Sequence, residues 1–524
     1  MAIETDVLVI GAGPAGLSTA IALKRRGYPG RVVVIDKGRS VGSHVLSGAV
    51  MDPAGFKDLL TEEEIAKLPV EAHVNRESFR FILGAGVSLP IPWVPPMMRA
   101  KGYPTGSLTK VVRYLADIAT RLGAEVYAGY AVTELVEENG VIVGARTGEK
   151  GIDSAGKPKS NHLPSEEVRA RVTVLAEGGA GILTDRLIAA KGLEGRRPQS
   201  YAIAIKERIE LPAPVEGHGG TILHTFGYPV DMGTYGGGFV YHVSDSQVMV
   251  GYALGLDYKD PSIDVHDLFR RFKATKAVQM HIAGGKAVAY GAKMIPEGGF
   301  YAMPRPYAPG ALIVGDGVGL LDGLRIKGIH IAMQSGIAAA EAIAAGTDGL
   351  GERYYRLLKK TKGYREVKRV KNVHGGFTYG APLGVAMAGF AWATFGTFPF
   401  WMFGRHHKDS ETLRPLKRGT KKSCLPATGV DRLTDVFMSG TIHDETQPCH
   451  LKLLDAAKCE ACERQFGSPC TRFCPAEVYR REEKGIRMDF SNCLHCKTCK
   501  VKCPCENIEW TFPQGGDGPR YTRL

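Results

Sequence analysis

A glycine-rich turn between an apolar strand and a helix is the feature that most restricts the folds open to this chain. Residues 6–10 (DVLVI) have the length and composition of a buried strand, and residues 11–16 (GAGPAG) follow with the spacing G-x-G-x-x-G. A helical pattern over 17–26 and a second apolar strand over 31–35 come next, and the second strand ends at Asp36. This order of strand, turn, helix and strand predicts a parallel sheet that binds a dinucleotide at its first turn.

Each glycine of this turn has a separate physical task. Gly11 permits the tight turn, Gly13 lets a diphosphate approach the backbone, and Gly16 lets the helix pack closely against the strand. The amino terminus of the helix then faces the phosphates. Asp36 is placed to accept hydrogen bonds from a ribose.

Two later segments favour FAD over a nicotinamide as the bound dinucleotide. Residues 171–178 predict a strand that runs into a small-residue turn, and residues 311–319 predict another, followed by a helix from about Ile329 to Ala345. Flavoproteins of the glutathione-reductase and hydroxybenzoate-hydroxylase type return to the nucleotide domain in this way. Asp316 would meet the ribityl chain, and the helix start near Gly328 would place positive dipole beside the flavin pyrimidine ring. A simple strand-to-helix turn is the alternative for the second segment. Because no second complete fingerprint for NAD(P)H follows, we do not expect a nicotinamide reductant.

The cysteines occupy only the carboxyl-terminal part of the chain. The sequence has 524 residues and 11 cysteines, none of them before Cys424, and nine lie between Cys459 and Cys505. A disulfide scaffold would spread its cysteines through a small secreted chain. The pattern therefore indicates metal binding in a reducing compartment. The length predicts two to four domains.

One set of cysteines has the spacing of a bacterial ferredoxin. Three cysteines at two-residue intervals are followed by a Cys-Pro pair, and in that architecture the fourth cysteine of each run serves the other cluster. This logic assigns one [4Fe–4S] cluster to Cys474, Cys493, Cys496 and Cys499. Zinc is the alternative, since it also accepts C-x2-C pairs.

The same spacing argument applies to a second set of cysteines, for which two interpretations stay open. A second [4Fe–4S] cluster would use Cys459, Cys462, Cys470 and Cys503. A disulfide or free thiols would be the other interpretation, because the set contains a seven-residue insertion and is followed by the extra Cys505. Cys424 and Cys449 fit neither set.

An uncharged segment with basic flanks suggests contact with a membrane surface. Residues 375–404 contain no charged side chain, while residues 353–371 carry nine Lys/Arg against one acid and residues 405–422 carry seven against two. An interfacial helical dip into anionic lipid is the preferred interpretation, and burial in the core is the alternative. Residues 89–98, apolar and proline-rich, could belong to the same surface. The net charge of +13 invites a nucleic-acid reading, but no nucleic-acid reader motif is present.

Ten segments together resemble the electron transfer flavoprotein–ubiquinone oxidoreductase family along nearly the whole chain. They are GSHVLSGAVMDP (42–53), AEVYAGYAV (124–132), VLAEGGAG (174–181), YGGGFVYH (235–242), GGKAVAYGAK (284–293), EGGF (297–300), RIKGIHIAMQSG (325–336), QPCHL (447–451), FCPAEVY (473–479) and NCLHCKTC (492–499). Enzymes of this family take electrons from reduced electron transfer flavoprotein and deliver them to a membrane quinone through FAD and one [4Fe–4S] cluster. Members commonly lack the second cysteine set, which would mark a two-cluster variant with a different donor, such as a ferredoxin.

The resemblance implies a fold, a division into domains and a set of site residues. The expected fold is α/β plus α+β: an FAD domain (1–75, 126–200, 305–350), an inserted quinone-binding sheet domain (76–125, 201–304), a helical membrane-surface segment (351–425) and a ferredoxin-like [4Fe–4S] domain (426–524). Gly236 and Gly237 are expected at the quinone headgroup, since glycines at a strand end let a planar ligand approach. The expected FAD contacts are Gly11, Gly13, Gly16, Asp36, Lys37, Ser47, Gly48, Glu177, Gly178, Gly315, Asp316 and Gly328.

The predicted activity is that of an electron-transferring-flavoprotein dehydrogenase, in which the cofactors and not side chains perform the chemistry. Its predicted partners are electron transfer flavoprotein, a membrane quinone and the membrane surface, without nucleic acid. The first strand begins close to Met1, so we expect a peripheral or monotopic protein at the cytoplasmic face of a prokaryotic inner membrane. Two rival functions stay open: a geranylgeranyl-type flavin reductase of prenyl lipids, and a non-catalytic relay subunit of a larger flavin complex.

Overall fold

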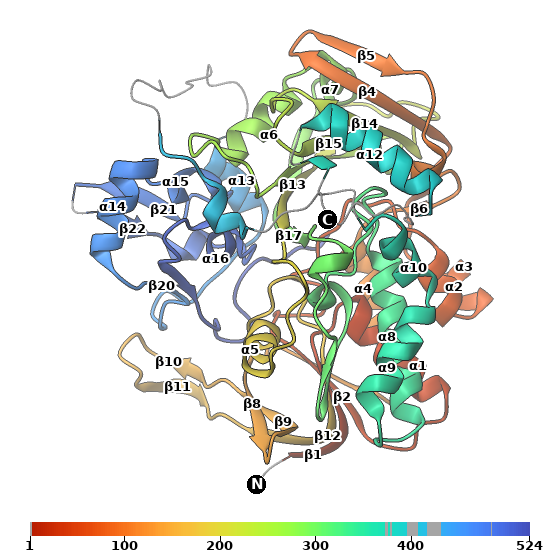
Figure 1. The fold of residues 1–524 in the computed structure, drawn as a ribbon, viewed down its shortest axis with the longest axis vertical. Coiled ribbons are helices and arrows are strands. Elements are labelled where there is room, and N and C mark those ends of the chain that lie inside the picture. The colour runs from red at the N-terminus through yellow and green to blue at the C-terminus, as the bar shows by residue number, and fades with distance from the viewer. Residues whose placement is uncertain (1–2, 372–375, 378–379, 396–406, 417–430, 484) are drawn as a thin grey trace.

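Two large β-sheets and a carboxyl-terminal unit form most of the molecule (Figure 1). Two small two-stranded sheets lie outside these parts, one of β3 (Ala72–His73) with β6 (Pro104–Thr105) and one of β10 (Lys150–Ile152) with β11 (Pro158–Leu163). The computed structural model describes residues 3–524 apart from 372–375, 378–379, 396–406, 417–430 and 484. The carboxyl-terminal unit, residues 431–524, lies at the left of Figure 1, and the helices of the nucleotide fold lie at the lower right.

The first sheet is parallel at its centre, with the strand order β18-β19-β12-β1-β2-β7. Val7 of β1 lies opposite Val172 of β12 on one side and Val32 of β2 on the other. These central strands consist largely of buried valine, leucine and isoleucine, as expected of a parallel sheet covered on both faces. The strands are β1 (Ile3–Ile10), β2 (Val32–Asp36), β7 (Glu125–Ala128), β8 (Val132–Glu138), β9 (Val141–Thr147), β12 (Glu167–Leu175), β18 (Tyr307–Ala308) and β19 (Ala311–Ile313).

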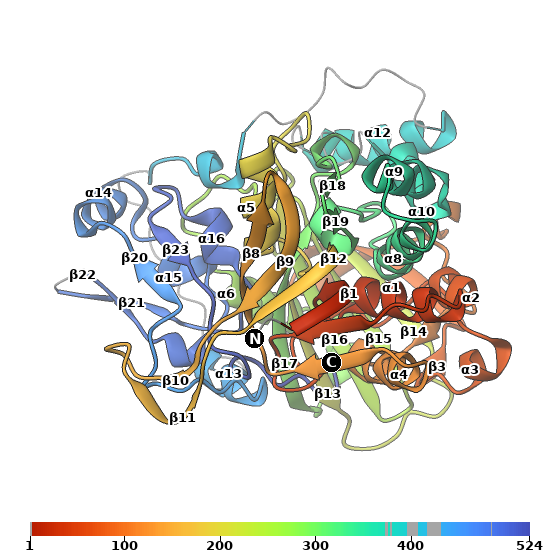
Figure 2. The ribbon, with the colours of Figure 1, turned by 90° about the horizontal axis from the view of Figure 1, so that it is seen from below.

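Helices α1 (Pro14–Arg25) and α8 (Ile329–Ala344) pack closely against each other beside this sheet (Figure 2). A methyl group on Gly336 of α8 would lie 2.2 Å from the carbonyl oxygen of Ala15, and one on Gly16 would lie 2.0 Å from that of Gly11. Only glycine therefore fits at either position. Helix α1 begins three residues earlier than predicted because Pro14 is suited to the first turn of a helix. Around this pair lie α2 (Ala54–Leu59), α3 (Glu62–Ala66), α4 (Leu108–Arg121), α9 (Leu350–Lys360) and α10 (Lys362–Arg369).

The second sheet combines strands from two distant parts of the sequence, in the order β17-β13-β16-β15-β14-β4-β5. Its pairs are antiparallel except for β14 with β4, where His224 lies opposite Phe79. Phe269 and Phe272 of helix α6 are fully buried and contribute to the core of this part. The elements are β4 (Arg76–Gly84), β5 (Val87–Ile91), β13 (Tyr201–Glu210), β14 (Thr221–Gly227), β15 (Gly236–His242), β16 (Gln247–Gly255), α6 (Val265–Lys273), α7 (Lys276–Ile282) and β17 (Lys286–Pro296).

The carboxyl-terminal unit shares one hydrophobic core with the second sheet. The Tyr290 hydroxyl of β17 donates a hydrogen bond to the carbonyl oxygen of Pro475 at 2.8 Å. The last residue reaches back to the nucleotide fold, where the Ser107 hydroxyl donates to the Leu524 carbonyl oxygen at 2.7 Å. The elements of the unit are α13 (Arg432–Met438), β20 (Leu451–Leu453), α14 (Ala456–Phe466), α15 (Cys470–Phe473), β21 (Tyr479–Glu482), β22 (Gly485–Met488), α16 (Thr498–Lys502) and β23 (Ile508–Trp510).

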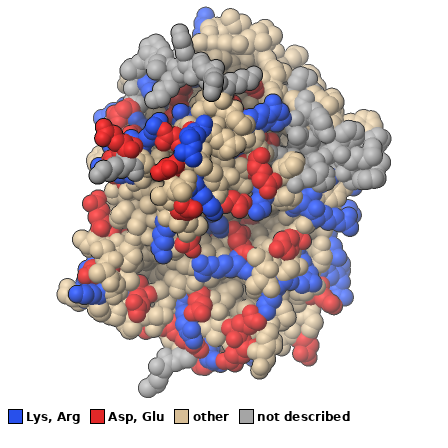
Figure 3. Space-filling model, turned by 60° about the vertical axis from the view of Figure 1, so that its left-hand side comes forward, with Lys and Arg blue, Asp and Glu red and all other residues tan. Residues whose placement is uncertain are grey.

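The apolar segment predicted over residues 375–404 lies only partly within the described residues. Its described portion contains helix α12 (Ala381–Ala393), which exposes Leu383, Val385 and Phe390. Within the described parts of the chain, every helix is too short or too polar to traverse a bilayer. On the face shown in Figure 3, described Lys and Arg side chains are interspersed with Asp and Glu and form no continuous basic surface.

Candidate functional site

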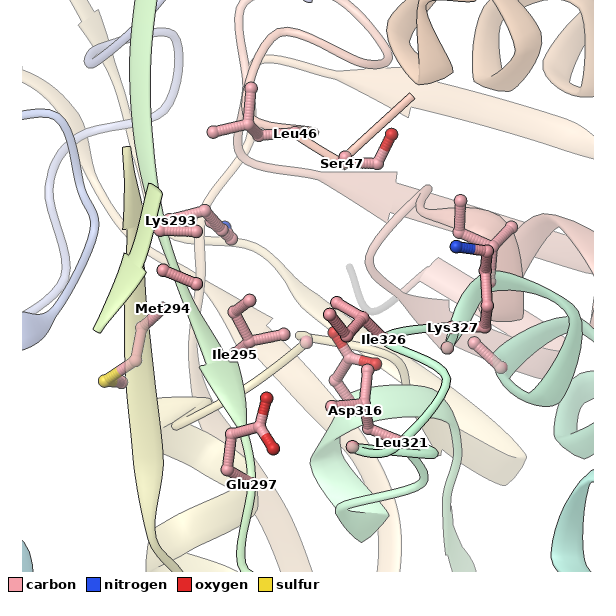
Figure 4. Close-up of a pocket in the computed structure, with 18 of the residues that line it drawn as sticks. Leu46, Ser47, Lys293, Met294, Ile295, Glu297, Asp316, Leu321, Ile326 and Lys327 are labelled. Carbon is pink, nitrogen blue, oxygen red and sulfur yellow. The ribbon is translucent and has the colours of Figure 1, made fainter. Parts of the chain in front are cut away.

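A cavity of about 860 Å³ lies where the first sheet, the second sheet and the carboxyl-terminal unit meet (Figure 4). This volume falls in the range of cofactor and substrate sites, about 300–1,000 Å³. Apart from Gly16, which packs within the fold, all residues predicted to contact FAD or quinone line this one cavity. They are Gly11, Gly13, Asp36, Lys37, Ser47, Gly48, Glu177, Gly178, Gly236, Gly237, Gly315, Asp316 and Gly328.

One end of the cavity suits a diphosphate and a ribose. No atom lies within 4 Å of where a side-chain carbon on Gly13 or Gly178 would stand, so the backbone there is open to a ligand. No side chain caps the amino terminus of α1, which leaves its N–H groups available to phosphate. Asp36 accepts hydrogen bonds from the backbone N–H of Ala12 at 2.9 Å and of Gly38 at 2.7 Å. Its carboxylate holds the turn and keeps acceptor capacity for a sugar hydroxyl.

The other end of the cavity suits a flavin ring. Helix α8 begins at Ile329 without a side-chain cap, and Gly328 and Ile329 line the cavity, so the positive end of the helix dipole faces it. Burial raises the pKa of Asp316, and the nearby ammonium of Lys293 opposes that rise. The arrangement provides a positive field for an electron-accepting ring.

Glu177 has a structural use in addition to lining the cavity. One of its carboxylate oxygens accepts hydrogen bonds from the backbone N–H and the hydroxyl of Thr184, both at 2.7 Å. This caps helix α5 (Ile182–Lys191), whose N-cap residue, Gly181, has no side chain to do so.

The first cysteine set converges beside this cavity. The set, Cys474, Cys493, Cys496 and Cys499, lines a separate small cavity in the carboxyl-terminal unit. Burial raises the pKa of all four thiols, and repulsion between neighbouring sulfurs raises it further for Cys474, Cys493 and Cys499. Four ionised thiolates therefore need a cationic centre to hold them together. Two donors point at these sulfurs: the His495 backbone N–H to Cys493 and the Thr498 hydroxyl to Cys496, each at 3.4 Å.

The spacing of the sulfurs argues against zinc. Among the described residues, no three cysteines have Sγ atoms all within 4.8 Å of one another. Four thiolates on one zinc would be about 3.8 Å apart, given Zn–S bonds of about 2.3 Å in a tetrahedron. An iron–sulfur cluster, whose ligands bind four different irons, needs the wider spacing.

The second cysteine set is also brought together. Repulsion by Cys503 raises the pKa of both the Cys462 and the Cys470 thiols, after burial as the main cause. Asn507 donates hydrogen bonds from its side-chain amide to Cys459 Sγ at 3.1 Å and from its backbone N–H to Cys503 Sγ at 3.4 Å. The extra Cys505 lies in the same group, because it too raises the pKa of Cys462. The described cysteines are all free thiols, so the disulfide interpretation is wrong for them.

Comparison with known proteins identifies the family. A protein-family model described as "electron transfer flavoprotein-ubiquinone oxidoreductase, 4Fe-4S" matches residues 427–522. A second family model, for the ubiquinone-binding domain of the same enzymes, matches residues 201–295, and a third, for FAD-dependent oxidoreductases, matches residues 6–85. The electron transfer flavoprotein–ubiquinone oxidoreductase of Pseudomonas aeruginosa is 36% identical over 99% of this chain and 99% of its own length. The mitochondrial enzyme of Arabidopsis thaliana is 36% identical over 100% of this chain and 85% of its own length.

The chain belongs to the electron transfer flavoprotein–ubiquinone oxidoreductase family. The family prediction and the predicted FAD-type fold with a carboxyl-terminal iron–sulfur unit are confirmed. A geranylgeranyl bacteriochlorophyll reductase-like protein from Thermoplasma acidophilum aligns with a TM-score of 0.55 at 18% identity, covering 75% of this chain and 96% of its own. That likeness shows a shared flavoprotein fold and nothing about the reaction.

This electron transfer flavoprotein–ubiquinone oxidoreductase family member also contains site residues that the sequence did not single out. Lys497 and Trp510 line both the large cavity and the cysteine cavity, so they form the wall between them. Lys37 and Lys497 both lie over the Trp510 ring, 5.0 Å and 5.7 Å from its centre. His495, which stands between two cluster cysteines, packs against the same ring. The segment NCLHCKTC was the only sequence signal for this wall, and Trp510 had none.

Proposed function

We propose that this protein takes electrons from reduced electron transfer flavoprotein and delivers them to a membrane quinone. FAD and one [4Fe–4S] cluster are its cofactors. The cluster is held by Cys474, Cys493, Cys496 and Cys499, and FAD occupies the end of the cavity lined by Gly13 and Asp36. When bound, these groups supply the redox chemistry, while the chain fixes their positions and tunes their potentials.

The shared wall between the two cavities is the observation that carries this proposal. A single layer of side chains, Lys497 and Trp510, separates the cysteine cavity from the large one. The Lys497 side-chain nitrogen donates a hydrogen bond to the Ala180 carbonyl oxygen at 2.9 Å, which fixes the wall to the nucleotide fold. A rigid and thin partition suits electron transfer between two centres that never need to move.

The quinone end of the proposal rests on Gly236 and Gly237 at the start of β15. Both line the large cavity and belong to the second sheet, whereas the glycine turn of the nucleotide fold belongs to the first. A side-chain carbon on Gly237 would lie 2.8 Å from the Thr225 carbonyl oxygen, so the strand admits no larger residue there. That contact explains the glycine by packing against β14, and the quinone proposal rests on the place of both residues in the cavity wall, where a run of glycines exposes its backbone to a planar headgroup. The domain division given by the sequence, with residues 76–125 and 201–304 forming the quinone-binding part, is proposed with this site.

Turnover with purified partners tests the proposal. Reduced electron transfer flavoprotein and a soluble quinone analogue should give steady quinone reduction. Saturation of a prenyl lipid without quinone turnover would instead identify a geranylgeranyl-type reductase. If the purified protein showed neither activity and copurified with further subunits, it would be identified as a relay subunit.

We also propose that the second cysteine set, Cys459, Cys462, Cys470 and Cys503, holds a second [4Fe–4S] cluster. The gathering of its four thiols supports this, because a [4Fe–4S] cluster needs four thiolates, and two of them, Cys459 and Cys503, accept hydrogen bonds from Asn507. Such a cluster would let a ferredoxin-type donor feed the first one.

Iron content separates the one-cluster and two-cluster forms. About eight irons per flavin, falling to about four in Cys462→Ser, would support the second cluster. Cys449→Ser is the matched control, since Cys449 only accepts a backbone hydrogen bond from Leu451 at 3.4 Å. Four irons per flavin in the unmodified protein would rule the second cluster out.

Attachment to a membrane surface is the last part of the proposal. Exposed apolar side chains lie on β4, β5 and α12 and directly after β5 and α12, and two of them, Trp93 and Val385, also line the large cavity. A quinone tail could pass from lipid directly into the cavity at this point. The exposed side chains are Leu83, Val87, Leu89, Trp93, Leu383, Val385, Phe390 and Phe395. A peripheral position on the cytoplasmic face of a prokaryotic inner membrane is proposed accordingly.

Flotation with liposomes tests the membrane surface. Trp93→Asp and Val385→Asp should reduce binding to vesicles that contain anionic lipid. Phe437→Asp is the control, because Phe437 is 85% exposed but lies on α13 in the carboxyl-terminal unit. Equal loss of binding in all three variants would contradict the assigned surface.

A further inference from the structure

A buried carboxyl group faces the large cavity without any partner. Glu297 directly follows β17, is 6% exposed and lines the cavity. Among the described residues, its carboxyl group forms neither a hydrogen bond nor an ion pair, while its backbone N–H is held by the Ser200 carbonyl oxygen at 2.7 Å. Figure 4 shows the side chain pointing from β17 toward the loop that carries Asp316 and Leu321. A buried polar group with no partner is rare unless it has a function.

Glu297 lies close to the segment proposed to bind the quinone. A side-chain carbon on Gly323 would come within 2.6 Å of Glu297 Oε2, so this carboxyl group packs directly on the Gly323 backbone. The Tyr235 hydroxyl donates to the Gly323 carbonyl oxygen at 3.4 Å. Tyr235 immediately precedes Gly236 and Gly237 in the chain. Glu297 therefore lies near the Tyr235 hydroxyl, in the wall of the same cavity that Gly236 and Gly237 line.

The surroundings keep Glu297 protonated at neutral pH. Burial is the main cause, and the negative charges of Asp322 and Asp257 add to it, raising the pKa of Glu297 to about 8. The two charges come from connecting segments: Asp322 lies between β19 and α8, and Asp257 lies two residues after β16. Tyr235, directly before β15, also faces Glu297, because burial and then the charge of Glu297 raise the pKa of Tyr235. No arginine or lysine pairs with Glu297 among the described residues. Below about pH 8 the group therefore has a proton to give.

We infer that the Glu297 carboxyl group donates a proton to the quinone as the quinone is reduced. This inference rests on the proposed function. Reduction of a quinone to a quinol takes up two electrons and two protons. The Glu297 O–H breaks to give one proton to a quinone oxygen, cavity water supplies the other proton, and FAD, when bound, would supply the two electrons. Glu297 is left as a carboxylate and regains its proton from water after the quinol leaves.

Another titratable side chain that lines the cavity is less suited to this role. His330 uses its Nε2 atom to contact Glu366 at 2.9 Å. Its Nδ1 atom is buried and has no accessible surface. Neither nitrogen is free to meet a ligand, whereas the Glu297 carboxyl group lines the cavity without a hydrogen bond or ion pair among the described residues.

Glu297→Gln tests the inference, since glutamine keeps the size of the side chain and cannot release a proton. Quinone reduction at pH 7 should fall about 100-fold, the typical contribution of a positioned proton donor. Reduction of ferricyanide, which accepts one electron and no proton, should be unchanged. In the unmodified protein, quinone turnover should decline as the pH rises through about 8, and this inflection should vanish in Glu297→Gln.

Infrared difference spectroscopy gives a readout that is independent of turnover. The protein should show a protonated carboxylic acid band that disappears as the pH rises through about 8, and Glu297→Gln should lack it. Asp322→Asn removes a negative charge beside Glu297 without lining the cavity, so it should move the transition to lower pH while quinone turnover at pH 6 persists.

The outcomes separate the inference from the function on which it rests. Absence of quinone turnover in the unmodified protein would overturn the proposed function. If Glu297→Gln reduced quinone at the rate of the unmodified protein and with the same pH profile, only the inference about Glu297 would be overturned. An acid band that still titrates through about pH 8 with undiminished amplitude in Glu297→Gln would also overturn it, because the acid that titrates there would then be another buried carboxyl group, such as Glu207 or Asp316.

Discussion

The Thr498 hydroxyl should set part of the reduction potential of the first cluster. Thr498 is 1% exposed and its hydroxyl lies 3.4 Å from Cys496 Sγ. A thiolate bound to iron can only accept, so the hydroxyl donates to it. Thr498→Val replaces the hydroxyl by a methyl group of the same shape and deletes this one hydrogen bond.

The size of the shift follows from the strength of one hydrogen bond. A typical bond contributes about 0.5–1.5 kcal/mol net. The reduced cluster carries one more negative charge than the oxidised one, so it loses more when the donor is removed. For a one-electron couple, about 1.4 kcal/mol corresponds to about 59 mV. Thr498→Val should therefore lower the cluster potential by about 20–60 mV.

A redox titration followed by electron paramagnetic resonance of the reduced cluster measures this shift. Thr441→Val is the matched control, because the Thr441 hydroxyl donates to the carbonyl oxygen of Cys493 at 2.8 Å and to no sulfur. Its cluster potential should change little. A potential that rises in Thr498→Val, or an equal shift in both variants, would refute the reasoning.

Three further perturbations test the packing and the electrostatics. Gly336→Ala places a methyl group 2.2 Å from the Ala15 carbonyl oxygen, so it should destabilise the fold by about 1–3 kcal/mol in thermal unfolding and lower the flavin content. Arg432→Met leaves Asp264 without the ion pair that it makes at 2.6 Å, which should cost about 2–3 kcal/mol in urea unfolding. Burial lowers the pKa of His224 to about 3. Below about pH 6.5 this histidine is therefore protonated in the unfolded state and still neutral in the folded state. Stability should therefore fall as the pH drops from 6.5, by about 2 kcal/mol from this group at pH 5, and His224→Gln should flatten the dependence in unfolding titrations.

Two exposed positions serve as controls for these variants. A side-chain carbon on Gly86 meets no atom within 4 Å, so Gly86→Ala should leave the melting temperature unchanged. Arg487 has a side chain that is 61% exposed, so Arg487→Met should change the free energy of unfolding by less than about 0.5 kcal/mol. If Gly336→Ala or Arg432→Met behaved like its control, the contact assigned to it would be wrong. An unchanged acid slope in His224→Gln would contradict the assignment of His224.

Local signals in the sequence were sufficient to predict the nucleotide fold and the carboxyl-terminal iron–sulfur unit. The G-x-G-x-x-G turn is specified by its own residues, because Gly11 has a φ of +110° and no room for a side chain beside Ala176. The helix at Ile329 was placed to within one residue at its end, since a long apolar helix has a clear period. Cysteine spacing in a short stretch fixes which sulfurs can meet.

The rest of the site depends on contacts between residues far apart in the sequence. Strands β4 and β5 join a sheet whose other strands begin at Tyr201, and no local pattern specifies that pairing. Trp510 becomes part of the wall only because β23 pairs with β20 and packs beside the cluster loop. Glu297 lies in a motif that the sequence did identify, but its lack of a partner is visible only in three dimensions.

Five lysines that line the large cavity couple the binding of FAD to the presence of the first cluster. They are Lys37, Lys206, Lys293, Lys327 and Lys497, and burial lowers the pKa of each. A diphosphate and a four-thiolate cluster both bring negative charge into this region, which favours the charged form of a nearby lysine. Lys37 and Lys497 lie at the wall between the cavities, so either cofactor can act on them. Binding of FAD should therefore be accompanied by proton uptake, and loss of the cluster should weaken FAD binding through the same lysines.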